Sequence, residues 1–187
     1  MNAPLRPAET AGESRYDAAT IWLHWITAAL VLGLWTLGEL ADAFPRGAPR
    51  DAAWSVHVAA GLLLTAILAV RVVWRAGYGR ALPPLEAGPL HALSRLTHLA
   101  LYALLIAVVA SGIANASYRG FNLFGVWAMP QFGTADRATR RMINEWHEWT
   151  ANLILAVSLL HAAAALVHHY VWRDRLIDRM RFGRTPA

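Results

Sequence analysis

Residues 147–171, HEWTANLILAVSLLHAAAALVHHYV, combine an apolar stretch long enough to cross a bilayer with histidines near both of its ends. The hydrocarbon core of a bilayer is about 30 Å thick, so about twenty apolar residues in a helix span it. His147 and His161 are fourteen residues apart, which corresponds to about 21 Å of rise and nearly four whole turns. The stretch therefore predicts one membrane helix that presents two imidazoles on one stripe at two depths.

The composition of the whole chain indicates a membrane protein. Of its 187 residues 57% are hydrophobic and nine are Trp, which is more apolar surface than a water-soluble core of this size can bury. The apolar segments predict four membrane-spanning helices, at residues 18–40, 54–76, 96–116 and 148–171. We therefore predict an all-α membrane protein, a single domain over 1–187 folded as a four-helix transmembrane bundle.

The two ends of the chain are expected to be tails. Residues 1–16 are polar and lack the apolar region of a cleavable signal peptide, and residues 172–187 are basic. The chain has no Cys, which excludes disulfides, iron–sulfur clusters and covalent haem attachment through a Cys-x-x-Cys-His motif. Any metal cofactor must therefore be held by nitrogen or oxygen atoms.

The distribution of basic residues predicts the orientation. All 17 are Arg, and an excess of them marks the cytoplasmic side of a membrane protein. If the amino terminus is cytoplasmic, that side holds the majority: Arg6, Arg15, Arg71, Arg75, Arg80, Arg95, Arg173, Arg175, Arg179, Arg181 and Arg184. We therefore expect both termini in the cytoplasm. The arginines bracket apolar helices, so their expected partner is membrane lipid and not nucleic acid.

The histidines of the spans fall into two pairs of similar depth. His24, near the cytoplasmic end of its helix, is level with His161, and His57, near the opposite face, is level with His147. A single histidine in a span is as often a packed core residue as a ligand. Two matched pairs favour bis-imidazole ligation of two b-type haems inside the bundle. On depth alone His168, seven residues after His161 on the same stripe, could replace it.

The segments around these histidines resemble the bacterial cytochrome b561 family. The resemblance extends from Tyr16 to Met180 and is carried by HWITAAL (24–30), SVHVAAGLLLTAILAVRVVWR (55–75) and WHEWTANLILAVSLLHAAAALVHHYVWRD (146–174). The most similar pattern is the superoxide oxidase type, a four-helix di-haem protein that passes electrons from superoxide to ubiquinone. It implies one haem held by His24 and His161 on the cytoplasmic side, and another held by His57 and His147 on the periplasmic side.

Three further residues receive roles from their depth in the membrane and their side-chain chemistry. His168 and His98 are expected to hydrogen-bond a quinone head group or deliver protons to it, although solvated interfacial histidines would explain them equally well. Arg71, fourteen residues after His57, reaches the depth of the cytoplasmic haem. It can pair with a haem propionate or extend to lipid phosphate.

Charged residues also crowd the connector before the fourth span: Arg119, Arg137, Arg140 and Arg141, with Asp136 and Glu145. Such a patch can attract a small anion such as superoxide, while a solvated helix flank would show the same composition.

The function expected from these features is transmembrane electron transfer in the bacterial inner membrane. We predict a superoxide:ubiquinone oxidoreductase that oxidises superoxide, or another periplasmic donor, and reduces ubiquinone. The alternative is a quinol-oxidising cytochrome b subunit that exchanges electrons with a separate dehydrogenase or reductase. A transporter for divalent metal is a third class, disfavoured because Glu39 and Asp42 provide few acidic ligands.

Overall fold

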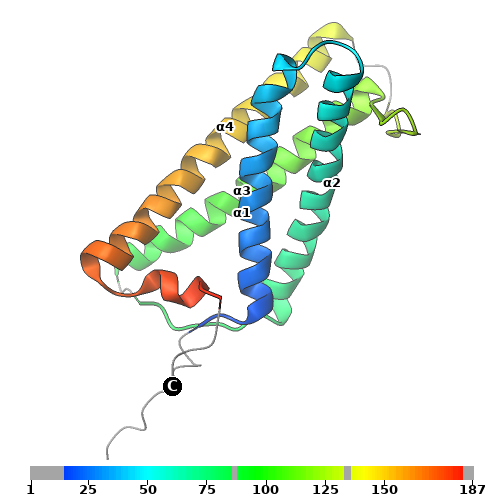
Figure 1. Cartoon of the computed structure of the whole chain (residues 1–187). Helices are drawn as coiled ribbons and strands as arrows, with labels where there is room; N and C mark the ends of the chain where they lie inside the picture. Colours follow the sequence, from blue (N-terminus) through cyan, green and yellow to red (C-terminus); the bar gives the residue numbers. More distant parts are fainter. Residues whose placement is uncertain (1–14, 86–87, 133–135, 183–187) are drawn as a thin grey trace, which may run out of the picture.

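Four long helices make up most of the computed structural model, which describes residues 15–85, 88–132 and 136–182. They are α1 (Ala18–Leu40), α2 (Ala48–Gly77), α3 (Pro89–Arg119) and α4 (Arg137–Val167), and they run side by side as one elongated bundle (Figure 1). All four are long and apolar enough to cross a membrane. The prediction of an all-α, four-helix membrane bundle is confirmed, and the chain is a multi-pass membrane protein.

Three helices begin earlier than predicted. α2 begins at Ala48 rather than at residue 54, α3 at Pro89 rather than at 96, and α4 at Arg137 rather than at 148. The predicted bounds followed the apolar residues alone, whereas helices continue into polar flanks where their first turn is stabilised. Proline occupies the first turn of α2 and α3, and the Asp136 carboxylate caps α4 by accepting a hydrogen bond from the Thr139 N–H at 2.7 Å.

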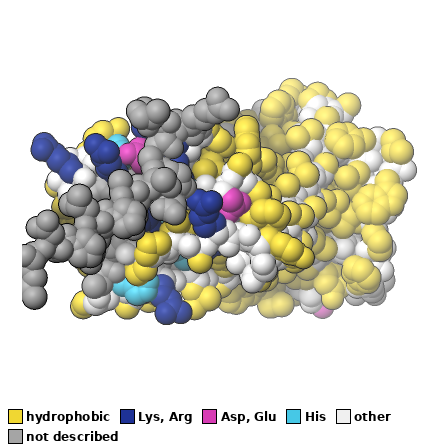
Figure 2. Space-filling view, turned by 90° about the horizontal axis from the view of Figure 1, so that it is seen from below, with side chains coloured by type: hydrophobic (Ala, Val, Ile, Leu, Met, Phe, Trp, Pro, Cys, Tyr) yellow, Lys and Arg dark blue, Asp and Glu magenta, His cyan; other side chains and the backbone are white. Residues whose placement is uncertain are grey.

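The core of the bundle is small and the outer surface is apolar. Leu64, Leu68, Leu105 and Ile154 form the buried cluster at its centre. Trp149, in contrast, is 74% exposed on α4. Hydrophobic side chains also dominate the right half of the view in Figure 2, and charged ones gather in its left half. A bundle surrounded by lipid requires this inversion, since its outer faces never meet water.

The bundle has two distinct ends. We call the end that holds both ends of the described chain the terminal end, because Tyr16 N–H donates to the Arg179 carbonyl there at 3.2 Å. We call the opposite end the hairpin end. It carries the antiparallel strands β1 (Asn122–Leu123) and β2 (Trp127–Ala128). The Phe124 N–H between the strands donates to the buried Ser55 hydroxyl of α2 at 3.0 Å, which fixes the hairpin on the bundle.

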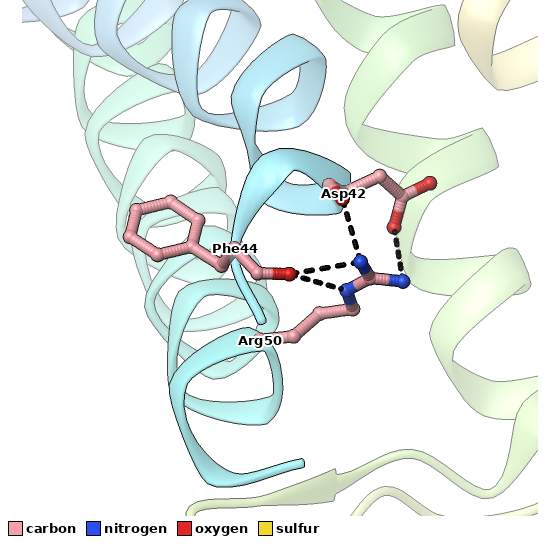
Figure 3. Close-up of polar contacts among 3 residues, drawn as sticks. All are labelled: Asp42, Phe44 and Arg50. Atoms are coloured by element: carbon pink, nitrogen blue, oxygen red, sulfur yellow. Dashed lines mark hydrogen bonds and ion pairs between the residues drawn. The ribbon is translucent and has the colours of Figure 1, made fainter. Parts of the chain in front are cut away.

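The connection between α1 and α2 at the hairpin end is held by one arginine. After a short 3-10 turn, η1 (Ala41–Ala43), the Arg50 guanidinium donates to the Phe44 carbonyl at 2.8 and 3.1 Å and to the Asp42 carbonyl at 2.6 Å (Figure 3). It also pairs with the Asp42 carboxylate at 3.7 Å. Because a guanidinium has five donors in a fixed fork, this single side chain can hold both Asp42 and Phe44 and so stabilise the connection.

At the terminal end, an aspartate connects α1 to α2 and to the loop that follows α2. Asp17 caps α1, accepting from Thr20 N–H at 2.9 Å, and it also accepts from the indole N–H of Trp74 at 2.9 Å and from the Arg80 N–H at 3.0 Å. Burial acts to raise the pKa of Asp17, but the hydrogen bonds outweigh it and hold the pKa below its ordinary value. The ionised carboxylate therefore ties α1, α2 and the following loop together.

The carboxyl-terminal residues fold back against this end instead of forming a tail from residue 172 onward. After the π-helical turn η2 (His168–Trp172) comes the 3-10 helix η3 (Leu176–Met180), which lies between the lower ends of α4 and α1 in Figure 1. The indole N–H of Trp25 donates to the Met180 carbonyl at 2.9 Å. Residues 1–14 and 183–187 of the predicted tails, with Arg6 and Arg184, lie outside the described residues.

Candidate functional site

The structure brings the four histidines of the spans together in the two predicted pairs. At the terminal end the rings of His24 on α1 and His161 on α4 have centres 6.4 Å apart. At the hairpin end the rings of His57 on α2 and His147 on α4 have centres 6.2 Å apart. All four side chains are half-buried. One helix, α4, thus contributes one imidazole to each end of the bundle.

These separations fit a single iron between each pair of rings. A bond from a metal to histidine nitrogen is about 2.1 Å long and the ring centre lies about 1.1 Å behind that nitrogen, so two rings on opposite sides of one ion are about 6.4 Å apart. The described part of the chain has no cluster of three or more His, Cys, Asp or Glu side chains able to hold a metal. Two imidazoles with no further donor side chain would suit a b-type haem, because the porphyrin would supply the remaining iron ligands.

In the hairpin-end pair a backbone carbonyl orients the ring of His147. Nδ1 of His147 donates to the Val108 carbonyl at 3.1 Å and lies 3.2 Å from the Ser111 hydroxyl. Because a carbonyl only accepts, the proton is on Nδ1 and the lone pair of Nε2 is left for a metal. Nδ1 of His57 is buried without a hydrogen-bond partner.

Glycines allow helices to approach these two rings. A Cβ atom on Gly112 of α3 would lie 2.9 Å from Cε1 of His147, and one on Gly38 of α1 would lie 3.4 Å from Cε1 of His57. No alanine can replace Gly112 without displacing the His147 ring. The sequence analysis missed both glycines. The dipeptide Ser111-Gly112 within an apolar stretch was the available signal.

The terminal-end pair is surrounded by polar side chains. The Arg71 guanidinium lies 3.1 Å from Nδ1 of His24 and donates to the Tyr102 hydroxyl at 3.1 Å. The ring of His98 lies 5.3 Å from that of His161, and its Nδ1 donates to the Ser94 carbonyl at 2.7 Å. Arg71 thus lies at the depth the sequence predicted, but its partner here is a histidine nitrogen.

His168 has different surroundings. Its Nδ1 is 2.5 Å from the Asp174 carboxylate, and its ring centre is 4.3 Å from that of Trp172. Asp174 was not singled out by the sequence analysis, because only the fold of η2 reverses the chain and brings residue 174 back to residue 168.

An arginine-rich cavity opens beside the hairpin-end pair. It has a volume of about 840 Å³ and is lined by Arg119, Arg137, Arg140, Arg141, Asn144, Glu145 and Glu148. Glu145 is paired with Arg141 at 2.7 Å, and Glu148 accepts a hydrogen bond from Asn144 at 2.5 Å. The lining carries four cations against two anions, and its two glutamates flank His147 in the sequence.

Comparison with known proteins identifies the family of the chain. A family model described as prokaryotic cytochrome b561 matches residues 15–183. The chain belongs to this family, whose members are transmembrane proteins that transfer electrons through b-type haem. The resemblance inferred from the sequence is therefore confirmed.

Individual relatives match over almost their whole length. Cytochrome b561 homolog 2 of Escherichia coli (strain K12) is 31% identical over 92% of this chain and 94% of its own. Cytochrome b561 homolog 1 of the same organism is 31% identical over 89% of this chain and 97% of its own. The probable superoxide oxidase CybB of Yersinia pestis is 30% identical over 89% of this chain and 95% of its own.

Proposed function

We propose that the chain is a di-haem superoxide:ubiquinone oxidoreductase of the bacterial inner membrane. The observation that carries this proposal is the pair of imidazole sites, with ring separations of 6.4 and 6.2 Å, at opposite ends of one membrane bundle. Two redox centres at two depths supply a path for electrons across the bilayer.

The proposed ligands are His24 and His161 for the haem at the terminal end, and His57 and His147 for the haem at the hairpin end. When bound, the haems supply reversible one-electron chemistry. The residues of the chain orient them: the Val108 carbonyl fixes the tautomer of His147. Arg71 places a cation at the terminal site, where it would serve as the counter-ion of a haem propionate.

The proposed orientation has the terminal end in the cytoplasm. The arginines of that end support it under the positive-inside rule. Those within the described chain are Arg15, Arg71, Arg75, Arg80, Arg95, Arg173, Arg175, Arg179 and Arg181. The hairpin end and its arginine-rich cavity then face the periplasm.

Superoxide is the proposed electron donor. The excess of cations in the cavity beside His147 supports this choice, because a positive cleft raises the local concentration and the on-rate of a small anion. The name of the Yersinia pestis relative, probable superoxide oxidase, supports it as well. Each superoxide gives up one electron and leaves as dioxygen.

Ubiquinone is the proposed acceptor at the terminal end. Its reduction consumes two electrons and two protons, so it needs a proton donor near the proposed haem at the terminal end. His98, 5.3 Å from the His161 ring, and His168 are the titratable side chains that we assign to quinone contact and proton delivery.

The test uses the purified protein in detergent. A reduced-minus-oxidised spectrum with a haem assay is expected to give two b-type haems per chain. Superoxide generated enzymatically is expected to reduce ubiquinone-1 only in the presence of the protein. A preparation with two haems but no superoxide-dependent reduction of the quinone contradicts the proposed donor.

The alternative function, a quinol-oxidising cytochrome b subunit with a separate redox partner, is supported by the β-hairpin. Val126 at its tip is 88% exposed, and Phe124 and Trp127 are 56% and 50% exposed. Such an apolar tip on the proposed periplasmic side suits a protein contact. Copurification of a stoichiometric periplasmic subunit, lost on exchanging these three residues for Ser, would favour this alternative.

A further inference from the structure

A phenol and an arginine meet beside the terminal-end pair. The Tyr102 hydroxyl of α3 accepts a hydrogen bond from the Nε–H of Arg71 on α2 at 3.1 Å. The guanidinium carbon lies over the Tyr102 ring, 5.5 Å from its centre. Nη2 of the same guanidinium lies 3.1 Å from Nδ1 of His24. The side chain of Arg71 therefore bridges Tyr102 and a proposed haem ligand.

Arg71 lies on the inner face of its helix. It follows Leu64 and Leu68 of the buried cluster by seven and three residues, which places all three on one stripe of α2. Its side chain is half-buried, whereas Arg75, one turn further, is exposed and donates to the Arg80 carbonyl at 3.0 Å. A cation that faces the interior of a membrane bundle is costly, so it indicates a function.

Tyr102 has the rigidity that a positioning residue needs. Its side chain packs against the buried cluster at the centre of the bundle, and a tyrosine loses little conformational entropy when it is held in this way. An arginine side chain is long and flexible, and without an inner anchor it extends toward lipid phosphate at the membrane surface. The Tyr102 hydroxyl supplies such an anchor for Arg71.

The contact with His24 cannot anchor Arg71 in the same way. A histidine that binds iron through Nε2 carries its proton on Nδ1, and a guanidinium has only donors. Two donors do not hydrogen-bond to each other. The contacts of Arg71 with Tyr102 do not depend on the tautomer of the histidine, because the phenol oxygen accepts in either case.

We propose that Tyr102 is a positioning residue, whose hydroxyl holds the Arg71 guanidinium beside His24 and thereby raises the midpoint potential of the terminal-end haem. This inference rests on the proposed function, which assigns a haem to that pair. A cation favours the reduced, less positive iron, and Coulomb energy falls with distance, so the effect depends on where the guanidinium is held. In the proposed direction of electron flow, a cation held at the terminal end favours the arrival of the electron there.

The decisive variant is Tyr102→Phe. It keeps the ring that packs on the core and lies beneath Arg71, but it removes the oxygen that accepts from Nε. The matched control is Tyr16→Phe. The Tyr16 ring lies in the same way beneath Arg75 of the same helix, 5.3 Å from the guanidinium carbon, but Arg75 donates to the Arg80 carbonyl and not to the pair.

The measurement is a redox titration of the purified protein followed by visible spectroscopy, which requires neither superoxide nor quinone. The terminal-end potential is the one absent from His161→Ala. We expect Tyr102→Phe to keep both haems and to lower this potential by about half of the fall seen in Arg71→Gln, because the cation is then free to move away. In the Arg71→Gln background, Tyr102→Phe should cause no further fall. The hairpin-end potential, and both potentials in Tyr16→Phe, should match the wild type.

Three results would each overturn the proposal. An unchanged terminal-end potential in Tyr102→Phe would show that Arg71 needs no such anchor. An equal fall with and without Arg71 would show that the hydroxyl acts on the haem directly. Loss of the haem from Tyr102→Phe would show that the hydroxyl supports only the fold of the site.

Failure of the proposed function has a different signature. If superoxide does not reduce the quinone, the two potentials and their differences between variants are still measured, and the expected pattern still supports the role of Tyr102. If the wild-type protein holds no haem at the terminal end, both proposals are wrong.

Discussion

The two histidine pairs have nearly the same ring separation but different surroundings. At the hairpin end His147 is held by a backbone carbonyl and by the close approach of Gly112. At the terminal end His24 contacts the Arg71 guanidinium, and His98 lies beside His161. One site is fixed by packing, while the other is surrounded by groups that carry charge or protons. The difference agrees with the proposed function, in which the hairpin end handles electrons alone and the terminal end couples them to protons.

The largest expected effect comes from removing one ligand of each pair. His147→Ala should lower the haem content from two to one per chain and abolish superoxide-dependent quinone reduction, by a hundredfold or more. His161→Ala should do the same by removing the other haem. The remaining haem should keep its own potential in each variant, as measured by redox titration with visible spectroscopy. An unchanged haem content in either variant would contradict the assignment of that pair.

The two pairs and the four spans could be predicted because they depend on simple periodicities. The length of an apolar stretch predicts a span, and the fourteen-residue spacing of His147 and His161 places both on one helix face. Neither depends on contacts between helices. The early starts of the helices were missed because α4 begins in a polar stretch that includes Arg137 and Arg140, where hydropathy gives no signal.

The surroundings of the pairs could not be predicted because they depend on contacts between helices. The distance from His147 to Gly112 is set by how α3 packs on α4. The depth of Arg71 followed from the sequence, but its contact with His24 depends on the rotation of two helices. Asp174 was missed for a related reason, because the η2 turn that returns it to His168 has no glycine to indicate a reversal.

The second prediction tests whether packing fixes the hairpin-end site. Gly112→Ala places a methyl group 2.9 Å from Cε1 of His147, and overpacking of this kind costs about 1–3 kcal/mol. We expect loss of most of the haem at that end with the terminal-end haem retained. Gly77→Ala is the control, since a Cβ at Gly77 meets nothing within 4 Å. Equal haem content in both variants would show that the helices can separate enough to accept the methyl group.

The third prediction concerns charge at the terminal end. Arg71→Gln removes a cation that lies 3.1 Å from Nδ1 of His24, and a unit charge within about 10 Å is worth about 2 kcal/mol at an effective dielectric constant of about 20. Because a cation favours the reduced, less positive haem, the midpoint potential of the terminal-end haem should fall while that of the hairpin-end haem stays constant. Arg71→Lys keeps the charge and should retain most of the potential. A parallel fall in both potentials would indicate a general disturbance of the bundle.

The smallest expected effect concerns the arginine-rich cavity at the hairpin end. Exchanging Arg137 and Arg140 together for Gln halves its cations while leaving the Arg141–Glu145 pair in place. The rate with superoxide should fall several-fold at low ionic strength, and the difference should vanish at high salt, because electrostatic steering is screened. Arg46→Gln removes a charge from the exposed connector between α1 and α2, outside the cavity lining, and should have little effect. If Arg46→Gln lowers the rate as much as the cavity variant does, the net charge of the hairpin end attracts the anion and the cavity has no special role.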